Sequence, residues 1–314
     1  MKKKTLSGAF IFLIIIGLIA AAVLFFKSDY LENKVSTTLS SKIYGNQDVK
    51  KTNQKKNKNN SEFIAAIYIE GEIEELNYTY DQKWLLNTIK ELKEDEKNLG
   101  IALFINSPGG AVYEADEVYL ALKDYKKEGK KIYTYMGALA ASGGYYISCA
   151  SNKIYANRNT LTGSIGVISG QVLDATDMMD KIGLKSETIH AGRNKNMGNF
   201  NEPISDEQRA ILQEIADECY DQFTGIVADD RKIPLDKVKE LADGRIYTAK
   251  QALELKLIDK IDSWDNMISD FKKNELNKEE CEVIDYKVNR QRSLSDLFGY
   301  SAKAITTNPV FLYK

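Results

Sequence analysis

The amino-acid sequence predicts an α/β protein, in which a mainly parallel sheet with flanking helices is preceded by one N-terminal transmembrane helix. From residue 63 onward, short apolar runs alternate with amphipathic segments, as expected of a parallel sheet covered by helices. Before residue 63, an uncharged stretch is long enough to span a bilayer. The 314 residues allow one large domain or two small ones, and 43% hydrophobic with 28% charged residues indicates a globular protein.

The uncharged stretch, 6–26, lies between a run of three lysines and Lys27. Its 21 residues exceed the apolar region of about 7 to 15 residues in a cleavable signal peptide. Ala20-Ala21-Ala22 keeps cleavage open as the alternative. The lysines favour a cytoplasmic N-terminus. We therefore expect a single-pass cell-membrane protein, with 1–5 cytoplasmic, 6–26 as the anchor and the rest extracytoplasmic.

Residues 27–62 are polar and rich in Lys and Asn, which predicts a solvated tether without a core. The globular domain is expected at 63–289. A tail at 290–314 ends in PVFLYK, and this apolar cluster either packs loosely on the surface or reaches a peptide groove of its own or a neighbouring subunit.

The expected elements of the domain follow one another in strand–helix–strand order, which favours parallel pairing. Their residues are 63–71 (strand), 82–93 (helix), 101–105 (strand), 111–127 (helix), 131–137 (strand), 142–150 (short helix) and 153–156 (strand). Farther on, Ser205 and Gln208 have the spacing of a capping box. The helix that follows has an apolar face of Ile211, Ile215, Cys219, Phe223 and Val227, so Cys219 is predicted to be a buried, inert thiol.

Composition excludes several classes of function. A net charge of -2 gives no excess of positive charge for binding nucleic acid. Three cysteines and one histidine are too few for a disulfide framework or a histidine-based metal centre. The chain has no phosphate-binding glycine motif of the P-loop type, and none of the dinucleotide type follows its first strand. We expect no cofactor.

Three glycine-containing junctions follow apolar runs, at 106–110, 141–144 and 162–166. In open α/β sheets, ligands bind beyond the carboxyl ends of the strands, so these loops could converge on one site. Ordinary turn chemistry is the alternative, because Gly, Pro, Asn and Ser are common turn residues.

A serine nucleophile in one of these loops needs a base. The lone His190, in the strand-like SETIHAG, is more often a structural residue than a catalytic one. Lysine can serve instead if it is neutral, which requires its pKa to fall by several units from about 10.4.

Two segments, LFINSPGGAVYEADEVYLAL and MGALAASGGYYISCASNKIYANRNTLTGSIGVI, resemble the short, single-domain form of the signal peptide peptidase A (SppA) family. The resemblance runs from about Ile64 to about Ile261 and is most specific over 104–167. It implies the crotonase-like fold shared with the Clp proteases and a membrane-anchored bacterial serine peptidase with a Ser-Lys dyad.

The resemblance also implies roles for individual residues. Ser142 matches the nucleophile, Lys195 in GRNKNM matches the base, and Ser164 matches the serine that orients the lysine amine. Gly109 matches one oxyanion-hole donor, and the Gly143 N–H is the expected second. A serine at the start of a helix suits this chemistry, because the following amides point toward the developing negative charge.

We therefore expect a membrane-tethered serine endopeptidase, and the resemblance implies that it hydrolyses hydrophobic peptides, such as signal peptides left after secretion. The resemblance also implies a ring-like homo-oligomer in which neighbouring protomers supply the nucleophile and the base. Tyr145, Tyr146 and Ile147 are expected either as exposed apolar contacts for this assembly or as core. A catalytically silent membrane scaffold and an acyl-CoA-processing crotonase-like enzyme are the alternatives.

Overall fold

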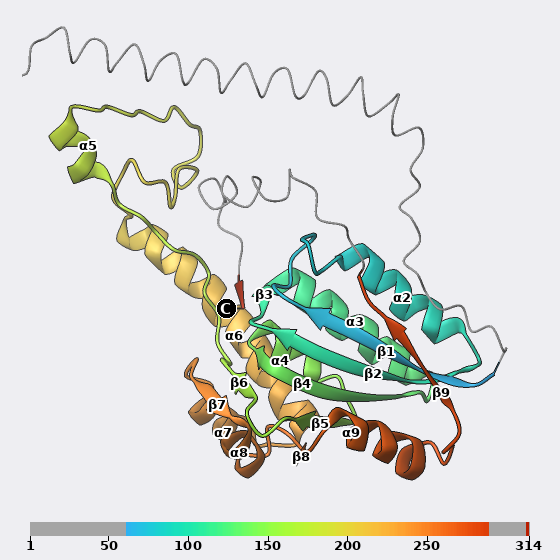
Figure 1. Cartoon of the computed structure of the whole chain (residues 1–314). Coiled ribbons are helices and arrows are strands. Elements are labelled where there is room, and N and C mark those ends of the chain that lie inside the picture. The colour runs from blue at the N-terminus through green and yellow to red at the C-terminus, as the bar shows by residue number, and fades with distance from the viewer. Residues whose placement is uncertain (1–60, 289–311, 314) are drawn as a thin grey trace, which may run out of the picture. The chain divides into compact units, whose positions relative to one another are not determined.

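The computed structural model describes residues 61–288 and 312–313 (Figure 1). The predicted anchor at 6–26, the tether up to residue 60 and most of the tail lie outside these residues. Within the described ranges, no helix combines the length and the apolar character needed to cross a membrane.

The described residues form an α/β domain whose sheet is mainly parallel, as predicted. Its path runs β7-β6-β4-β2-β1-β9, with β5 beside β4 and β8 beside β5, and β7 on β6 is the antiparallel pair. The strands are β1 (Phe63–Glu70), β2 (Asn98–Ser107), β4 (Lys131–Ala141), β5 (Lys153–Ala156), β6 (Leu161–Gly163), β7 (Ile246–Thr248), β8 (Lys260–Ile261) and β9 (Glu282–Tyr286). A separate pair joins β3 (Gly110–Ala111) and β10 (Leu312–Tyr313).

Two amphipathic helices, α2 (Gln82–Glu94) and α3 (Val112–Lys127), alternate with β1, β2 and β4. The predicted strand and helix order up to residue 156 is thus confirmed. The α2 helix begins where Asp81 accepts a hydrogen bond from Trp84 N, and it buries Leu85, Ile89 and Leu92 at helical spacing. These side chains join the main core with the inward residues of β1 and β2.

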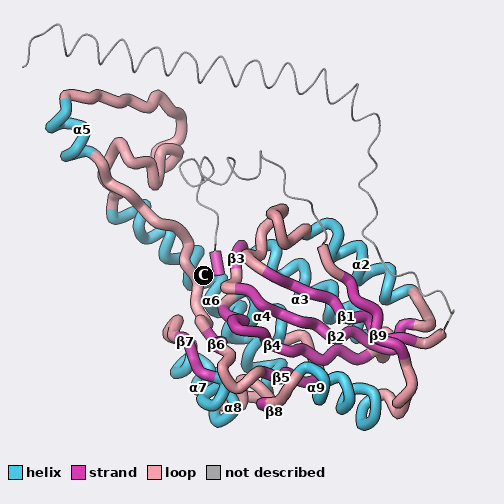
Figure 2. The backbone as a smooth tube through the Cα atoms, viewed as in Figure 1, coloured by secondary structure: helices cyan, strands magenta, loops and turns pink. Residues whose placement is uncertain are grey.

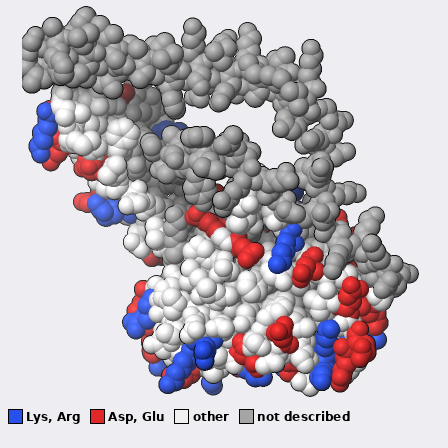
Figure 3. Space-filling model, viewed as in Figure 1, with Lys and Arg blue, Asp and Glu red and all other residues white. Residues whose placement is uncertain are grey.

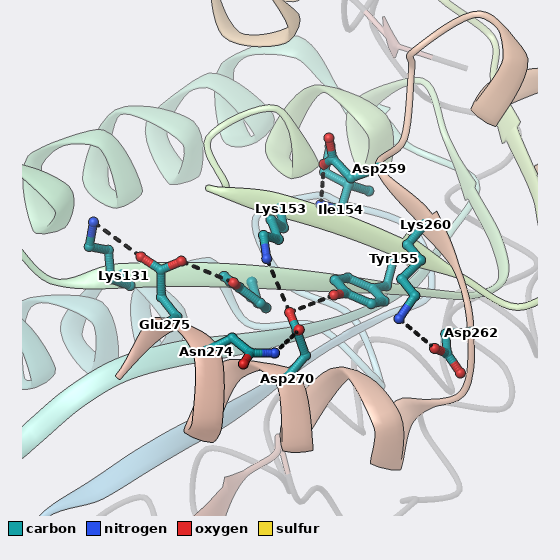
Figure 4. A network of polar contacts seen from close by, with 11 residues as sticks. Lys131, Lys153, Ile154, Tyr155, Asp259, Lys260, Asp262, Asp270, Asn274 and Glu275 are labelled. Atoms are coloured by element: carbon teal, nitrogen blue, oxygen red, sulfur yellow. Dashed lines mark hydrogen bonds and ion pairs between the residues drawn. The ribbon is translucent and has the colours of Figure 1, made fainter. Parts of the chain in front are cut away.

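A helix near the C-terminal end of the domain packs against a second cluster of buried residues that includes Tyr133 of β4. α9 (Trp264–Asp270) continues as a π-helical turn, η1 (Phe271–Glu275), and Phe271 stacks on Tyr133 with ring centroids 4.3 Å apart. Asp270 accepts hydrogen bonds from Lys153 and Tyr155, as Figure 4 shows. Glu275 pairs with Lys131 and accepts from Tyr133. These polar contacts fix the helix to β4 and β5.

The short helix predicted at 142–150 is α4 (Gly143–Ser148). Tyr145, Tyr146 and Ile147 are fully buried in it. Tyr145 Oη donates to Leu257 O, and Tyr146 Oη donates to Asp116. These three residues are therefore core, and the alternative that they form exposed subunit contacts is wrong.

The capping box at Ser205 and Gln208 is confirmed as the start of α6 (Asp206–Arg231). Phe223 and Val227 are fully buried, whereas Cys219 is only partly buried. The prediction of a buried Cys219 is therefore wrong, because the helix meets the core only in its second half. The other helices given by the structure are α5 (Thr176–Ile182), α7 (Leu235–Leu241) and α8 (Ala249–Glu254).

Residues 168–205, which we call the exposed arm, differ from the rest of the described domain. Only Met179 and Asn196 are buried in this arm. Loops and turns make up most of it, as Figure 2 shows, and α5 stands apart from the sheet in Figure 1.

Candidate active site

Ser142 lies at the turn where β4 ends and α4 begins. Its φ of 52° and ψ of -118° are unusual for a residue with a side chain, so the turn is held by its surroundings. The residue is fully buried. Its N–H donates to Gly163 O at 2.8 Å, but its Oγ has no hydrogen-bond partner among the described residues.

The three glycine-containing junctions converge at Ser142, as predicted. A Cβ on Gly143 would lie 3.4 Å from Gly109 Cα and 3.3 Å from Gly110 N, so the first two loops are in contact. The hydrogen bond from Ser142 N to Gly163 O brings in the third loop. Ser164 is the next residue, and its N–H donates to Arg245 O.

The loop after β2 is fixed by the segment that follows β1. Ile73 N donates to Gly109 O at 2.9 Å, and Ala111 N donates to Ile73 O at 2.8 Å. A Cβ on Gly110 would lie 1.9 Å from Ile73 O, so only glycine fits there. Gly109 has a φ of 107°, and its N–H donates to the Ser107 hydroxyl at 3.1 Å.

The end of the tail pairs with this loop. Tyr313 of β10 lies opposite Gly110, and Leu312 lies opposite Ala111, in antiparallel register. The edge of β3 therefore accepts an extended chain as an added strand. The pairing thus places residues 312–313 beside the Gly109 loop of their own chain.

Lys195 lies in the exposed arm, and its side chain is exposed. No hydrogen bond within the described residues joins it to Ser142 Oγ. His190 is also exposed, with Nδ1 3.0 Å from Gly192 O. The expectation of a strand around His190 is wrong, since 184–190 has no regular structure. A single chain thus gathers Ser142, Gly143, Gly109 and Ser164, but not Lys195.

The surface in Figure 3 has a broad area without charged side chains over β2 and β4. Aromatic rings of this sheet face lie close together. Phe104 stacks with Tyr135 at 5.9 Å, Trp264 meets Phe104 edge-on at 5.8 Å, and Tyr68 is 5.3 Å from Phe104. Apart from Tyr135, these rings are only partly buried.

Comparison with known proteins shows which family this sequence resembles. Residues 124–278 match the model of peptidase family S49. A protein of Enterococcus faecium whose name assigns it to signal peptide peptidase SppA is 33% identical, over 88% of this chain and 81% of its own length. The chain belongs to the SppA family of serine peptidases. Protease 4 of Haemophilus influenzae is a further member, 28% identical over 72% of this chain and 36% of its own length.

Membership in this family makes the chain a serine endopeptidase. It also resembles the chloroplastic serine protease SPPA of Arabidopsis thaliana, which is 35% identical over 56% of this chain and 26% of its own length.

Reasoning from sequence missed two parts of the site. Ile73 holds the Gly109–Ala111 backbone through its own backbone, so its side chain gives no signal. Ser107 belongs to the quoted NSPGG run, where a serine two residues before a glycine is a signal for a side-chain turn bond.

Proposed function

We propose that this chain is a membrane-anchored Ser-Lys endopeptidase that cleaves hydrophobic peptides, such as signal peptides left after secretion. The observation that carries the proposal is Ser142 Oγ, which is buried without a hydrogen-bond partner among the described residues. Leaving a buried hydroxyl unpaired costs about 1–3 kcal/mol. A native structure keeps such an exception for a reason, and here the reason proposed is a base supplied from outside the single chain.

In the proposed reaction, Ser142 Oγ attacks the scissile carbonyl carbon and its proton passes to Lys195 Nζ. The Gly143 N–H stabilises the oxyanion, and the Gly109 N–H joins it once it turns away from Ser107 Oγ, to which it donates in the single chain. Collapse of the tetrahedral intermediate breaks the C–N bond, and the leaving amine takes the proton from Lys195. Water, deprotonated by Lys195, then hydrolyses the acyl-enzyme and restores Ser142. Ser164 orients the lysine amine.

The base is proposed to come from a neighbouring protomer in a ring-like homo-oligomer. A lysine amine becomes a base by losing its charge, and burial favours the neutral form. In one chain Lys195 is exposed, so a second subunit is needed to cover it. The arm that carries it also leaves large apolar side chains in solvent, namely Leu173 (67% exposed), Met178 (61%), Ile182 (68%), Leu184 (53%), Ile189 (94%) and Phe200 (50%). Such patches mark association surfaces.

Two features support an extended, apolar substrate. The pairing of β10 with β3 supports binding of the peptide as an added antiparallel strand beside Gly110. A broad area over β2 and β4 is without charged side chains in Figure 3. An anchor at 6–26 would hold the domain on the extracytoplasmic side, where peptides released by secretion lie.

Mixing two inactive variants tests the dyad and its assembly together. We expect Ser142→Ala and Lys195→Ala to be inactive alone, and to regain partial activity when they are unfolded and refolded together. Some neighbouring pairs then unite an intact serine with an intact lysine. A mixture that stays inactive, although each variant assembles normally by light scattering, would show that the dyad forms within one chain.

A fluorophosphonate probe tests the nucleophile separately. Wild type should be labelled at Ser142, whereas Ser142→Ala should not. An unlabelled wild-type protein that still assembles would indicate a catalytically silent scaffold.

A further inference from the structure

We propose that Asn106 and Ser107, the last two residues of β2, are positioning residues that hold the two halves of the active site in register. One half is the loop that carries Gly109, and the other is the end of β4 that leads into Ser142. The inference rests on the proposed function of Ser142 and adds two residues to it.

Ser107 holds the first half. Its side chain is fully buried, and its Oγ accepts the Gly109 N–H at 3.1 Å. The same hydroxyl lies 3.5 Å from Gly109 O, at the limit for donating a hydrogen bond. Pro108 between them has a fixed φ and no N–H of its own. The hydroxyl therefore sets the direction of both peptide groups of Gly109. The N–H that it accepts is the proposed oxyanion donor, so Ser107 holds this donor in the single chain and releases it to the oxyanion.

Ser107 also touches the second half. It pairs with Ala140 of β4, two residues before Ser142. A Cβ on Gly144 would lie 3.2 Å from Ser107 O and 3.5 Å from Ser107 Cβ, so the first turn of α4 rests directly on this residue. A movement of Ser107 would shift the Gly109 loop and the Gly143 amide together.

Asn106 holds the second half through an irregularity in β4. Ile105 pairs with Met136, but Ser107 pairs with Ala140. An advance of two residues along β2 therefore corresponds to an advance of four residues along β4, which is a bulge in β4. The Asn106 side chain spans this bulge, since its Oδ1 accepts the Leu139 N–H at 3.2 Å. Bulges beside active sites re-aim the residues that follow them, and here the chain reaches Ser142 three residues later.

The hydrogen bonds of Asn106 and Ser107 should affect the catalytic rate as well as stability, because they lie beside the proposed catalytic groups. Each side chain bonds a backbone N–H in a segment that holds a reacting group or donor, and a misplacement of about 1 Å costs about a hundredfold in rate. The substrate would bind along β3, which neither side chain contacts in the hydrogen bonds given by the structure. Their loss should therefore lower kcat and leave KM nearly unchanged.

The test uses four variants in the full-length enzyme. Asn106→Ala and Ser107→Ala should each lower kcat by about ten- to a hundredfold, with KM within about twofold. Asn106→Asp keeps an oxygen acceptor for Leu139 N–H, and Ser107→Thr keeps the hydroxyl, so each should recover most of the lost rate. A peptide aldehyde, which forms a tetrahedral adduct with Ser142, should bind more weakly by the same factor as kcat/KM falls.

Ser151→Ala is the matched control. Ser151 Oγ is a buried hydroxyl that bonds Thr134 Oγ1 at 2.6 Å, away from the loops at Ser142. This variant should lower the melting temperature without changing kcat of the folded enzyme. Unchanged kcat in both alanine variants overturns the proposal, and so does a loss that merely follows the folded fraction in thermal melts. Failure of the conservative variants to exceed their alanine counterparts also counts against it.

The Ser142→Ala variant separates this inference from the function beneath it. If Ser142→Ala keeps activity, the proposed nucleophile is wrong, whatever Asn106 and Ser107 do. If Ser142→Ala is inactive while Asn106→Ala and Ser107→Ala are fully active, only the positioning role fails.

Discussion

Two parts of the described domain differ in how far their apolar side chains are buried. In the sheet region, 63–167, Tyr145, Tyr146 and the inward residues of β1 and β2 are fully buried. In the exposed arm, 168–205, Met178, Ile182 and Ile189 remain in solvent. Burial of apolar surface is the main force that stabilises a folded chain. The sheet region shares such a buried core with later residues such as Phe223 and Ile284, whereas most apolar side chains of the arm have no covering surface within the described residues.

The proposed catalytic groups are divided along the same boundary. Ser142, Gly109, Gly143 and Ser164 belong to the sheet region, and Lys195 belongs to the arm. If assembly covers the arm, it also delivers the base. A peptidase built as proposed would be inactive until it assembles, which would protect other proteins from cleavage.

The largest expected effect comes from removing the base in the arm. Lys195→Met should abolish peptide turnover, and Lys195→Arg should not restore it, because a guanidinium group does not lose its proton in proteins. Kinetic assays of the assembled variants measure this. His190→Phe is the control in the same arm and should keep activity, since no hydrogen bond joins His190 to Ser142 Oγ within the described residues. More than a few per cent activity in either Lys195 variant would place the base elsewhere.

A large but incomplete loss of activity is expected when charged residues replace apolar ones in the exposed arm. Met178 and Ile182 are four residues apart on α5 and both exposed. We expect Met178→Glu with Ile182→Glu to disperse the oligomer and lower activity more than tenfold, because buried unpaired carboxylates oppose association. Light scattering and circular dichroism should show a smaller particle with unchanged helix content.

The matched control is Leu120→Glu, which changes an apolar residue of α3 that is 51% exposed. It should leave the oligomer and the activity unchanged. Equal effects of the Leu120 and α5 changes would remove the distinction between the two regions.

A moderate effect, slow self-cleavage, is expected at the C-terminal tail. Because β10 occupies the edge of β3 beside Gly110, residues 312–313 lie where the substrate is proposed to bind. Wild type should slowly lose C-terminal residues, and Ser142→Ala should keep them. Intact-mass measurement over time follows the loss. An unchanged mass in active wild type would show that the paired tail is not a substrate.

The sheet region was largely predictable from sequence, and particular residues explain why the arm was not. Strands such as Phe63–Glu70 have continuous apolar runs, and the Ser205–Gln208 capping box is a purely local signal. The loops of Gly109, Ser142 and Ser164 follow strands, so their convergence follows from parallel topology. Cys219, by contrast, has the periodicity of a buried face but no core beneath it. Periodicity predicts that a face is apolar, without specifying what covers it.

The reactivity of two cysteines, Cys149 and Cys219, can measure this contrast. Burial raises the pKa of the Cys149 thiol to about 12, whereas burial raises that of the partly exposed Cys219 less strongly. Since the thiolate is the reactive form, Cys149 should resist iodoacetamide at pH 8 in every folded state. Cys219 should react in the dispersed α5 variant and be protected in assembled wild type. Mass spectrometry of the digested protein measures both, and denatured protein provides the full-reaction control.

The smallest effect should come from the ionic contacts that hold α9 to the sheet (Figure 4). Although partial burial disfavours the charge of Asp270, hydrogen bonds from Tyr155, Asn274 and Lys153 lower its pKa to about 2. An unfolded aspartate has a pKa of about 3.9, so the stabilisation is fully present above that pH and is lost as the pH falls through about 2. Asp270→Asn should cost about 1 kcal/mol near pH 6, or about 2–4 °C in Tm. The difference in Tm from wild type should shrink between pH 4 and 2.

Glu254→Gln is the control, at an exposed pair with Lys250 4.0 Å away, and it should change Tm little at any pH. If the Asp270 difference instead stays constant with pH, the carboxylate charge is not what holds the helix, and packing of Phe271 on Tyr133 accounts for its attachment.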